Sequence, residues 1–237
     1  MHNHFHGGEQ SLPMSRYWFR YPNSFPGHTA NAYEDESGKL ILDLTLSDKN
    51  VFFWWPDAQG NAPEPNSIQS QLTRFTIDPL SSDVNLSNPT ILQNGNSEFY
   101  RIDDRFVTQP YRHCFFDLMD PLLGTDFPAI APQLGGGYPL YNSLAHLDID
   151  TDKTEVYFLG KTHMVQEPVF IPRRGSATEG DGYVVALVNN YASMCSELHL
   201  LDTRDFTKFQ AVVLLPVRLR QGLHGNWVDS QHMQPKA

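Results

Sequence analysis

Two histidines beside glycine stand near opposite ends of this chain, in surroundings that suit metal chemistry. His224 lies in the segment Gly222-Leu223-His224-Gly225, just after the apolar run at residues 212–215. His28 directly follows Gly27 and leads into a run of alternating apolar residues. Small neighbours let a backbone and an imidazole approach a crowded centre, as a metal ligand at the end of a strand must do. Both histidines are therefore candidate metal ligands.

Glu98 and Glu167 are the candidate partners of these histidines. A histidine that binds a metal usually donates its other ring N–H to a carboxylate, which fixes the tautomer and the direction of the ring. Neutral imidazoles bind divalent iron, zinc, copper and nickel, so the residue types do not select the metal. By residue type alone, the four residues also suggest a different site, in which two histidines and one carboxylate bind a single iron ion directly.

The remaining histidines and both cysteines are predicted to have no metal or catalytic role. The alternating His2, His4 and His6 stand in a glycine-rich start that reads as a disordered tail. Surface or hydrogen-bonded strand positions are expected for the others: His113, His146, His163, His199 and His232. Cys114 and Cys195 are too few for a disulfide framework and form no CxxC pair.

Short strands must position these residues, and the chain is predicted to be all-β. Residues 39–46 alternate apolar and other side chains with a period of two. Similar segments stand at 71–77, 112–117, 143–149, 155–159, 183–188, 197–201 and 211–215. Turn-forming clusters among 17 prolines and 16 glycines separate them, and amphipathic helical windows of useful length are lacking.

A loose repeat runs through the strands. Residues 72–79 resemble residues 144–151, each a strand closed by an aspartate, and residues 197–203 are an imperfect third copy followed at once by a partner strand. Each copy has the form of two neighbouring strands of a β-propeller blade, although hairpins of a β-sandwich fit the periodicity as well. At about 40–50 residues per blade, the chain would supply about four or five blades at most.

Several motifs then occur in the order in which they stand in the carotenoid cleavage oxygenases, the family that includes the lignostilbene dioxygenases. They are Trp18-Phe19 and residues 25–34, 98–105, 166–173, 181–184 and 224–227. On these motifs the chain is identified as a member of that family. The local pattern, above all at 98–105 and at Gly27-His28, resembles the lignostilbene, microbial and fungal branch more than the animal retinoid enzymes.

This resemblance implies a seven-bladed β-propeller whose axis holds one Fe(II) between four histidines, with glutamates behind them and an apolar tunnel for a long conjugated substrate. Such enzymes insert O2 across a carbon–carbon double bond of a carotenoid, apocarotenoid or stilbene and release two carbonyl products. By motif, His28 resembles the third iron ligand and His224 the fourth. Glu98 and Glu167 resemble two of the glutamates that support the ligands.

The chain departs from the family at its start, because only 27 residues precede His28 and none resembles the segments of the first two ligands. We therefore expect the C-terminal half of a propeller at residues 16–229, between a tail at 1–15 and another at 230–237. Three explanations remain open: a truncated sequence, pairing with an N-terminal half, or a homodimer that combines two pairs of histidines. An inactive remnant that binds an apolar ligand or a partner chain is the alternative function.

Composition narrows the choice of partners. The formal net charge of −10, without acidic runs, argues against nucleic acid. No apolar stretch approaches the roughly 20 residues that span a bilayer, and the start lacks the hydrophobic region of a signal peptide. A cytoplasmic protein is expected, and peripheral membrane contact stays open because family members can dip an apolar patch into lipid.

Overall fold

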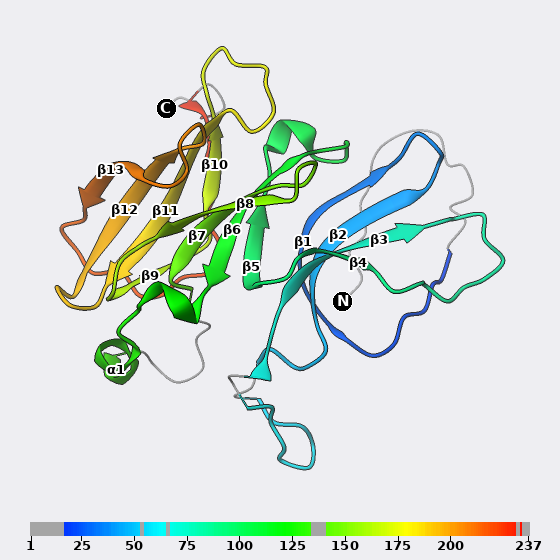
Figure 1. Ribbon diagram of the computed structural model, residues 1–237, viewed down its shortest axis with the longest axis horizontal. Helices are drawn as coiled ribbons and strands as arrows, with labels where there is room; N and C mark the ends of the chain where they lie inside the picture. Colours follow the sequence, from blue (N-terminus) through cyan, green and yellow to red (C-terminus); the bar gives the residue numbers. More distant parts are fainter. Residues whose placement is uncertain (1–16, 53–54, 65–66, 134–140, 231–232, 234–237) are drawn as a thin grey trace.

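The computed structural model describes residues 17–52, 55–64, 67–133, 141–230 and 233, and folds them into three antiparallel sheets in chain order (Figure 1). The first sheet contains β1 (Phe25–Glu34), β2 (Leu40–Ser47), β3 (Gln71–Ile77) and β4 (Thr90–Gln93). The second contains β5 (Asn96–Arg101), β6 (His113–Met119), β7 (Ser143–Asp148) and β8 (Lys153–Phe158). The third contains β10 (Val169–Pro172), β11 (Gly182–Asn190), β12 (Cys195–Asp202) and β13 (Phe209–Leu214), and β9 (His163–Val165) pairs with β11.

Helices are few and short, as the lack of amphipathic windows predicts. They are α1 (Phe127–Ile130) and the 3-10 helices Asp104–Phe106, Pro121–Leu123 and Ala131–Gln133. Among the described residues, none of these helices has the length and apolar character to cross a bilayer. The tail predicted at 1–15 lies outside the described residues, and of the tail predicted at 230–237 only residues 230 and 233 are described.

The sequence repeat corresponds to a structural repeat. Its three copies cover β3, β7 and β12, and each of these is the third strand in the order of its own sheet. A consecutive four-stranded antiparallel meander is the unit of a propeller blade, so the repeat marks equivalent strands of successive blades. The described residues form three such sheets, which is within the expected upper limit of about four or five blades, because long connections such as residues 48–70 and 120–142 take up the remaining length.

The second sheet lies between the other two and is covered on both faces. Phe116 on β6 packs toward Leu72 of the first sheet, whereas the adjacent Phe115 packs toward Phe170 and Val184 of the third sheet. Successive strand residues point to opposite faces, so one strand supplies both cores. The outer strand β13 is more open, and its apolar side chains Val213 and Leu214 are exposed.

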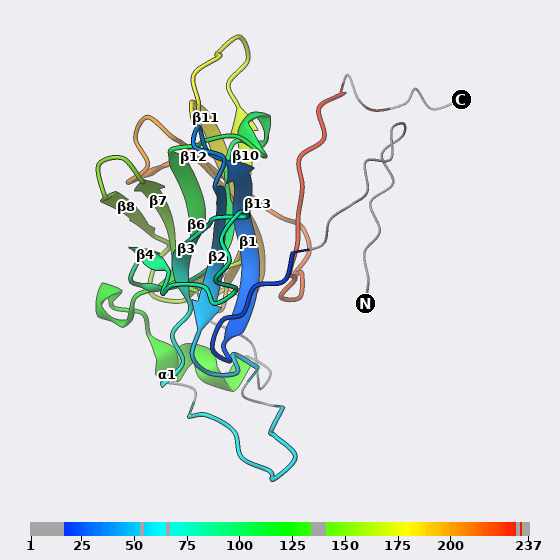
Figure 2. The same ribbon diagram turned by 90° about the vertical axis from the view of Figure 1, so that its right-hand side faces the viewer.

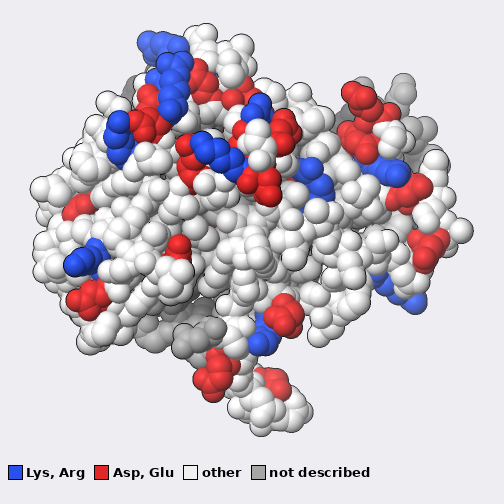
Figure 3. Space-filling view, in the orientation of Figure 1, with Lys and Arg blue, Asp and Glu red and all other residues white. Residues whose placement is uncertain are grey.

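Most basic side chains visible on the broad face of the molecule lie beside acidic ones (Figure 3). Arg112 pairs with Asp148 at 2.6 Å, and Arg173 pairs with Asp181 at 2.9 Å. After β13 the chain runs without helix or strand from residue 215 to residue 229 and crosses to the side where β1 lies (Figure 2). This crossing brings His224 close to His28.

Candidate metal centre

His28 lies on β1 where the pairing with β2 is irregular. The register shifts between Pro26 and Thr29, so His28 occupies a bulge in the strand. A Cβ on Gly27 would stand 1.9 Å from Glu98 Oε1 and 2.2 Å from Thr45 Oγ1. Only glycine leaves room there, which explains why a small residue precedes this histidine.

Glu98 holds His28 from the neighbouring sheet. Its Oε2 lies 2.8 Å from His28 Nδ1 and accepts the backbone N–H of Phe99 at 2.7 Å. Its Oε1 accepts the backbone N–H of His28 at 3.3 Å and the hydroxyl of Thr45. Burial raises the pKa of the Glu98 carboxyl, but these hydrogen bonds outweigh burial and lower the pKa below its ordinary value. The hydrogen bond between the side chains of Glu98 and His28 raises the pKa of His28, and burial opposes this with a smaller effect.

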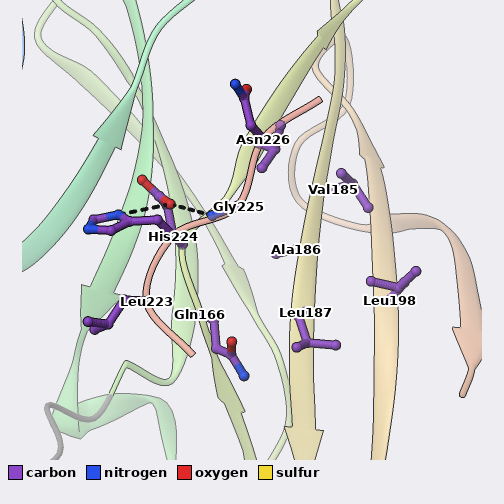
Figure 4. Close-up of a pocket in the computed structure, with 11 residues that line it drawn as sticks. Gln166, Val185, Ala186, Leu187, Leu198, Leu223, His224, Gly225 and Asn226 are labelled. Atoms are coloured by element: carbon purple, nitrogen blue, oxygen red, sulfur yellow. Dashed lines mark hydrogen bonds and ion pairs between the residues drawn. The ribbon is translucent and has the colours of Figure 1, made fainter. Parts of the chain in front are cut away.

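Glu167 holds His224 in a similar way. Its Oε2 lies 3.3 Å from His224 Nδ1 and accepts the backbone N–H of Gly225 at 2.8 Å (Figure 4). Arg101 Nε lies 3.2 Å from Glu167 Oε1, and the same guanidinium donates to the carbonyl of Gly225. The carboxylate therefore fixes both the ring and the backbone of the C-terminal segment.

The two imidazoles converge. Their ring centroids lie 4.9 Å apart with an angle of 76° between the planes. Each Nδ1 is engaged by a glutamate, and within the described part of the chain neither Nε2 has a hydrogen-bond partner. Their side chains are 43% and 57% exposed. Two histidines whose Nδ1 atoms are each held by a carboxylate in this way are candidates to offer their Nε2 atoms to one ion.

The donor set is incomplete within the described residues. No group of three or more His, Cys, Asp or Glu side chains is placed there to hold a metal ion. The two histidines and their glutamates fit a divalent metal by their chemistry, but they would supply two ligands and not a full coordination sphere.

The site also uses residues that the sequence did not single out. The Phe99 ring lies 4.9 Å from that of His28 and 5.9 Å from that of His224, centroid to centroid. Its φ of 56° places it in the left-handed region, at the bulge that follows Glu98. Thr45 and Arg101 anchor the two glutamates. The motif at 98–105 contained Phe99 and Arg101, but no periodicity reveals a bulge or a contact across sheets.

A small hollow of about 210 Å³ adjoins His224 (Figure 4). Its walls include Gln166 and Glu167 on one side and the apolar Val185, Leu187 and Leu198 on the other. The hollow combines apolar and polar side chains but is smaller than the roughly 300–1,000 Å³ of a usual ligand pocket.

Comparison with known proteins then decides the family. Residues 4–229 match the family model described as retinal pigment epithelial membrane protein, which stands for the carotenoid oxygenases. The chain belongs to the carotenoid cleavage oxygenase family. The predicted family is thereby confirmed, and so is the partial propeller, since the solved carotenoid oxygenases to which the chain is similar share its fold.

Within this family the chain is similar to relatives that are named for the cleavage of resveratrol, carotenoids and lignostilbene. It is 73% identical over 214 residues to resveratrol cleavage oxygenase 1 of Aspergillus fumigatus, covering 90% of this chain and 43% of that protein. It is 35% identical over 218 residues to lignostilbene-alpha,beta-dioxygenase isozyme III of Sphingomonas paucimobilis, covering 91% of this chain and 44% of that protein. The crystal structure of Pseudomonas brassicacearum lignostilbene dioxygenase matches with a TM-score of 0.81 and 37% identity, covering 89% and 43% of the two chains. The chain thus spans less than half the length of these relatives.

Three of the other histidines, His113, His146 and His199, lie in hydrogen-bonded positions on strands, whereas the buried Nδ1 of His163 on β9 has no hydrogen-bond partner among the described residues and its Nε2 lies 3.7 Å from Glu197 Oε2. His113 Nδ1 lies 3.0 Å from His146 Nε2, and His199 lies between Tyr157 and Glu197 at 3.0 Å and 2.8 Å. His232 lies outside the described residues. Cys114 and Cys195 are free thiols.

Proposed function

We propose that this chain supplies half of the Fe(II) centre of a dioxygenase that cleaves the central double bond of a stilbene into two aldehydes. The observation that carries this proposal is the convergence of His28 and His224, each backed by its own glutamate. A stilbene is preferred to a carotenoid or apocarotenoid because the relative at 73% identity is named for resveratrol.

Each residue has a defined task in this proposal. Glu98 and Glu167 accept the Nδ1 protons, which leaves the Nε2 lone pairs of His28 and His224 for the metal. Bound iron would supply the redox chemistry through which O2 reacts with the alkene. Phe99, whose ring packs against both imidazoles, would position the two rings, and the apolar wall at Leu187 and Leu198 would orient a planar substrate.

The two further imidazoles must come from outside the described residues. We favour a preceding segment of a longer polypeptide over a separate N-terminal half, and either of these over a second copy of this chain. A homodimer would place four histidines around one ion, so light scattering and iron analysis address it together. A monomeric mass with less than half an equivalent of iron per chain would rule it out.

The second candidate is a chain that no longer cleaves anything and binds an apolar ligand or a partner chain. It is favoured by the lack of a third ligand within the described residues. Anaerobic Fe(II) titration followed by O2 uptake with resveratrol and with an apocarotenoid separates the two candidates. Iron binding that is lost in His28→Ala and in His224→Ala supports the metal centre, whereas a parent chain that binds no iron, alone or with an added N-terminal half, leaves the second candidate.

The cytoplasmic location and the peripheral membrane contact stay predictions. Fractionation of cells that express the full-length protein would check both, because a lipid-associated form sediments with membranes and is released by detergent.

A further inference from the structure

A third carboxyl group, that of Asp117, lies on the strand next to Glu98. Asp117 is on β6 directly opposite Glu98 on β5. Residues opposite one another in an antiparallel pair point to the same face of the sheet, so the two carboxyl groups share a face. On the other side of β6 its partner is Leu144 of β7, which belongs to the core between the second and third sheets.

Asp117 differs from the other two carboxyl groups in its partners. Glu98 accepts hydrogen bonds from His28, Thr45 and the Phe99 backbone, as described above. Asp117 is 0% exposed, and neither of its side-chain oxygens has a hydrogen-bond partner among the described residues. The residues two positions away on the same face, Phe115 and Met119, are apolar and pack in the same core.

An outside partner cannot resolve this isolation. Both oxygens are sealed from the surface by this chain alone, so an added N-terminal half or a second copy would have to displace the chain to contact them. A buried carboxylate without a cation or a donor costs several kcal/mol, and such a group keeps its proton instead.

We propose that Asp117 is held as a neutral carboxylic acid and is the uncharged member of a three-carboxyl cluster with Glu98 and Glu167. Its role as a positioning residue rests on the proposed function. A third negative charge at this place would raise the proton affinity of the two glutamates and favour the protonation of one of them, and a protonated glutamate is no longer an anionic acceptor for the Nδ1 proton of a ligand. With Asp117 neutral, Glu98 and Glu167 remain anionic acceptors.

The electrostatic surroundings agree with this assignment. Burial is the main cause that raises the pKa of Asp117 far above its ordinary range, and the negative charges of Glu167 and Glu98 add to the effect. Among the described residues no basic side chain is a cause of the raised pKa of Asp117 or opposes it, and Arg101 pairs with Glu167.

Infrared spectroscopy of the 237-residue chain without metal tests the proposal. The wild type should show the carbonyl stretch of a protonated carboxylic acid at neutral pH and above, with a shift in D2O, and the band should be lost in Asp117→Asn. Asp103→Asn is the matched control, because Asp103 is equally buried but paired with Arg105, so only a carboxylate band should be lost there.

Two further variants test membership of the cluster. Glu98→Gln and Glu167→Gln each remove a neighbouring charge and should shift the frequency of the Asp117 band. Glu155→Gln should leave it unmoved, since Glu155 also lies beside a histidine, His146, but does not act on Asp117.

The absence of an acid band that depends on Asp117 would overturn the proposal. An Asp117 band whose frequency changes in neither glutamate variant would overturn it as well. If Asp117→Asn fails to fold, wild-type chain with carboxyl-13C aspartate decides by NMR, through the presence or absence of one aspartate carboxyl that stays protonated across the neutral range. None of these readouts requires metal, so a failed iron titration would refute the proposed function and leave the Asp117 result intact.

Discussion

His28 and His224 are held by regions of different construction. His28 is part of β1, in a bulge closed over by Gly27, Thr45 and Glu98. His224 belongs to the segment at 215–229, which has neither helix nor strand. Backbone N–H groups tie this segment down, among them those of Leu219 to Ser196 and Gly222 to Gln166, each at 2.8 Å.

In the proposed metal centre, the difference would combine one fixed ligand with one adjustable ligand. A ligand within a sheet is as rigid as the sheet, whereas a ligand on an irregular segment depends on a few anchors that can be removed one at a time. Four hydrogen-bond donors, from His28, Thr45 and Phe99, contact the Glu98 carboxylate, and fewer donors contact the Glu167 carboxylate. We therefore expect damage near His28 to reach the whole fold, and damage near His224 to remain local.

Substitution of the two glycines next to these histidines, Gly27 and Gly225, should reveal this difference most strongly. Gly27→Ala forces a Cβ into Glu98 and Thr45 and should cost roughly 3 kcal/mol of folding free energy, together with metal binding. Gly225→Ala is the matched control, because its Cβ would meet only Val169 at an ordinary 3.5 Å. Urea unfolding measures the folding free energy of both variants, and equal losses of folding free energy would contradict the account.

The two glutamates should differ by a smaller amount. Removing a carboxylate that orients a ligating histidine weakens metal binding by roughly 10- to 100-fold. We expect Glu98→Gln to lie at the upper end of this range and Glu167→Gln at the lower end, because the contacts to Nδ1 are 2.8 Å and 3.3 Å. Competition titration with cobalt(II) provides the ratio, and a larger effect at Glu167 would reverse the comparison.

Arg101 anchors only the irregular segment. Arg101→Met removes its contact with Glu167 and its hydrogen bond to the Gly225 carbonyl, and should cost about 1–3 kcal/mol. Hydrogen exchange at the Gly225 amide should accelerate while exchange in β1 stays unchanged. Arg204→Met, which breaks an exposed pair with Asp181, is the control and should alter neither.

The smallest effect concerns pH. The Glu98 hydrogen bond raises the pKa of His28, so folding takes up a proton relative to an unfolded histidine with a pKa of about 6.5. The stability from this pair is fully present below that unfolded value and is lost as the pH rises through the folded pKa. The difference in Tm between wild type and His28→Gln, without metal, should shrink from pH 6 to pH 9. A difference that grows with pH would contradict the sign.

The strands and the order of the blades could be predicted from the sequence because both are local. The period of two at 39–46 gave β2, and the repeat at 144–151 gave the third strand of the second sheet. The bulges at His28 and Phe99 could not be predicted, because they arise where two sheets meet. The role of Asp117 was hidden too, since its place in the predicted strand 112–117 does not reveal its isolation from any partner.

The central claim is that His28 and His224 bind the same ion, and histidine-selective NMR during titration with cobalt(II) tests it most directly. Two imidazoles 4.9 Å apart on one paramagnetic ion should broaden together along a single saturation curve. In His28→Asn the effect on His224 should weaken by at least about tenfold in cobalt concentration, the converse should hold in His224→Asn, and the double variant should lose no more than either single one. Two curves with different midpoints, or a His224 signal that ignores the loss of His28, would contradict the account.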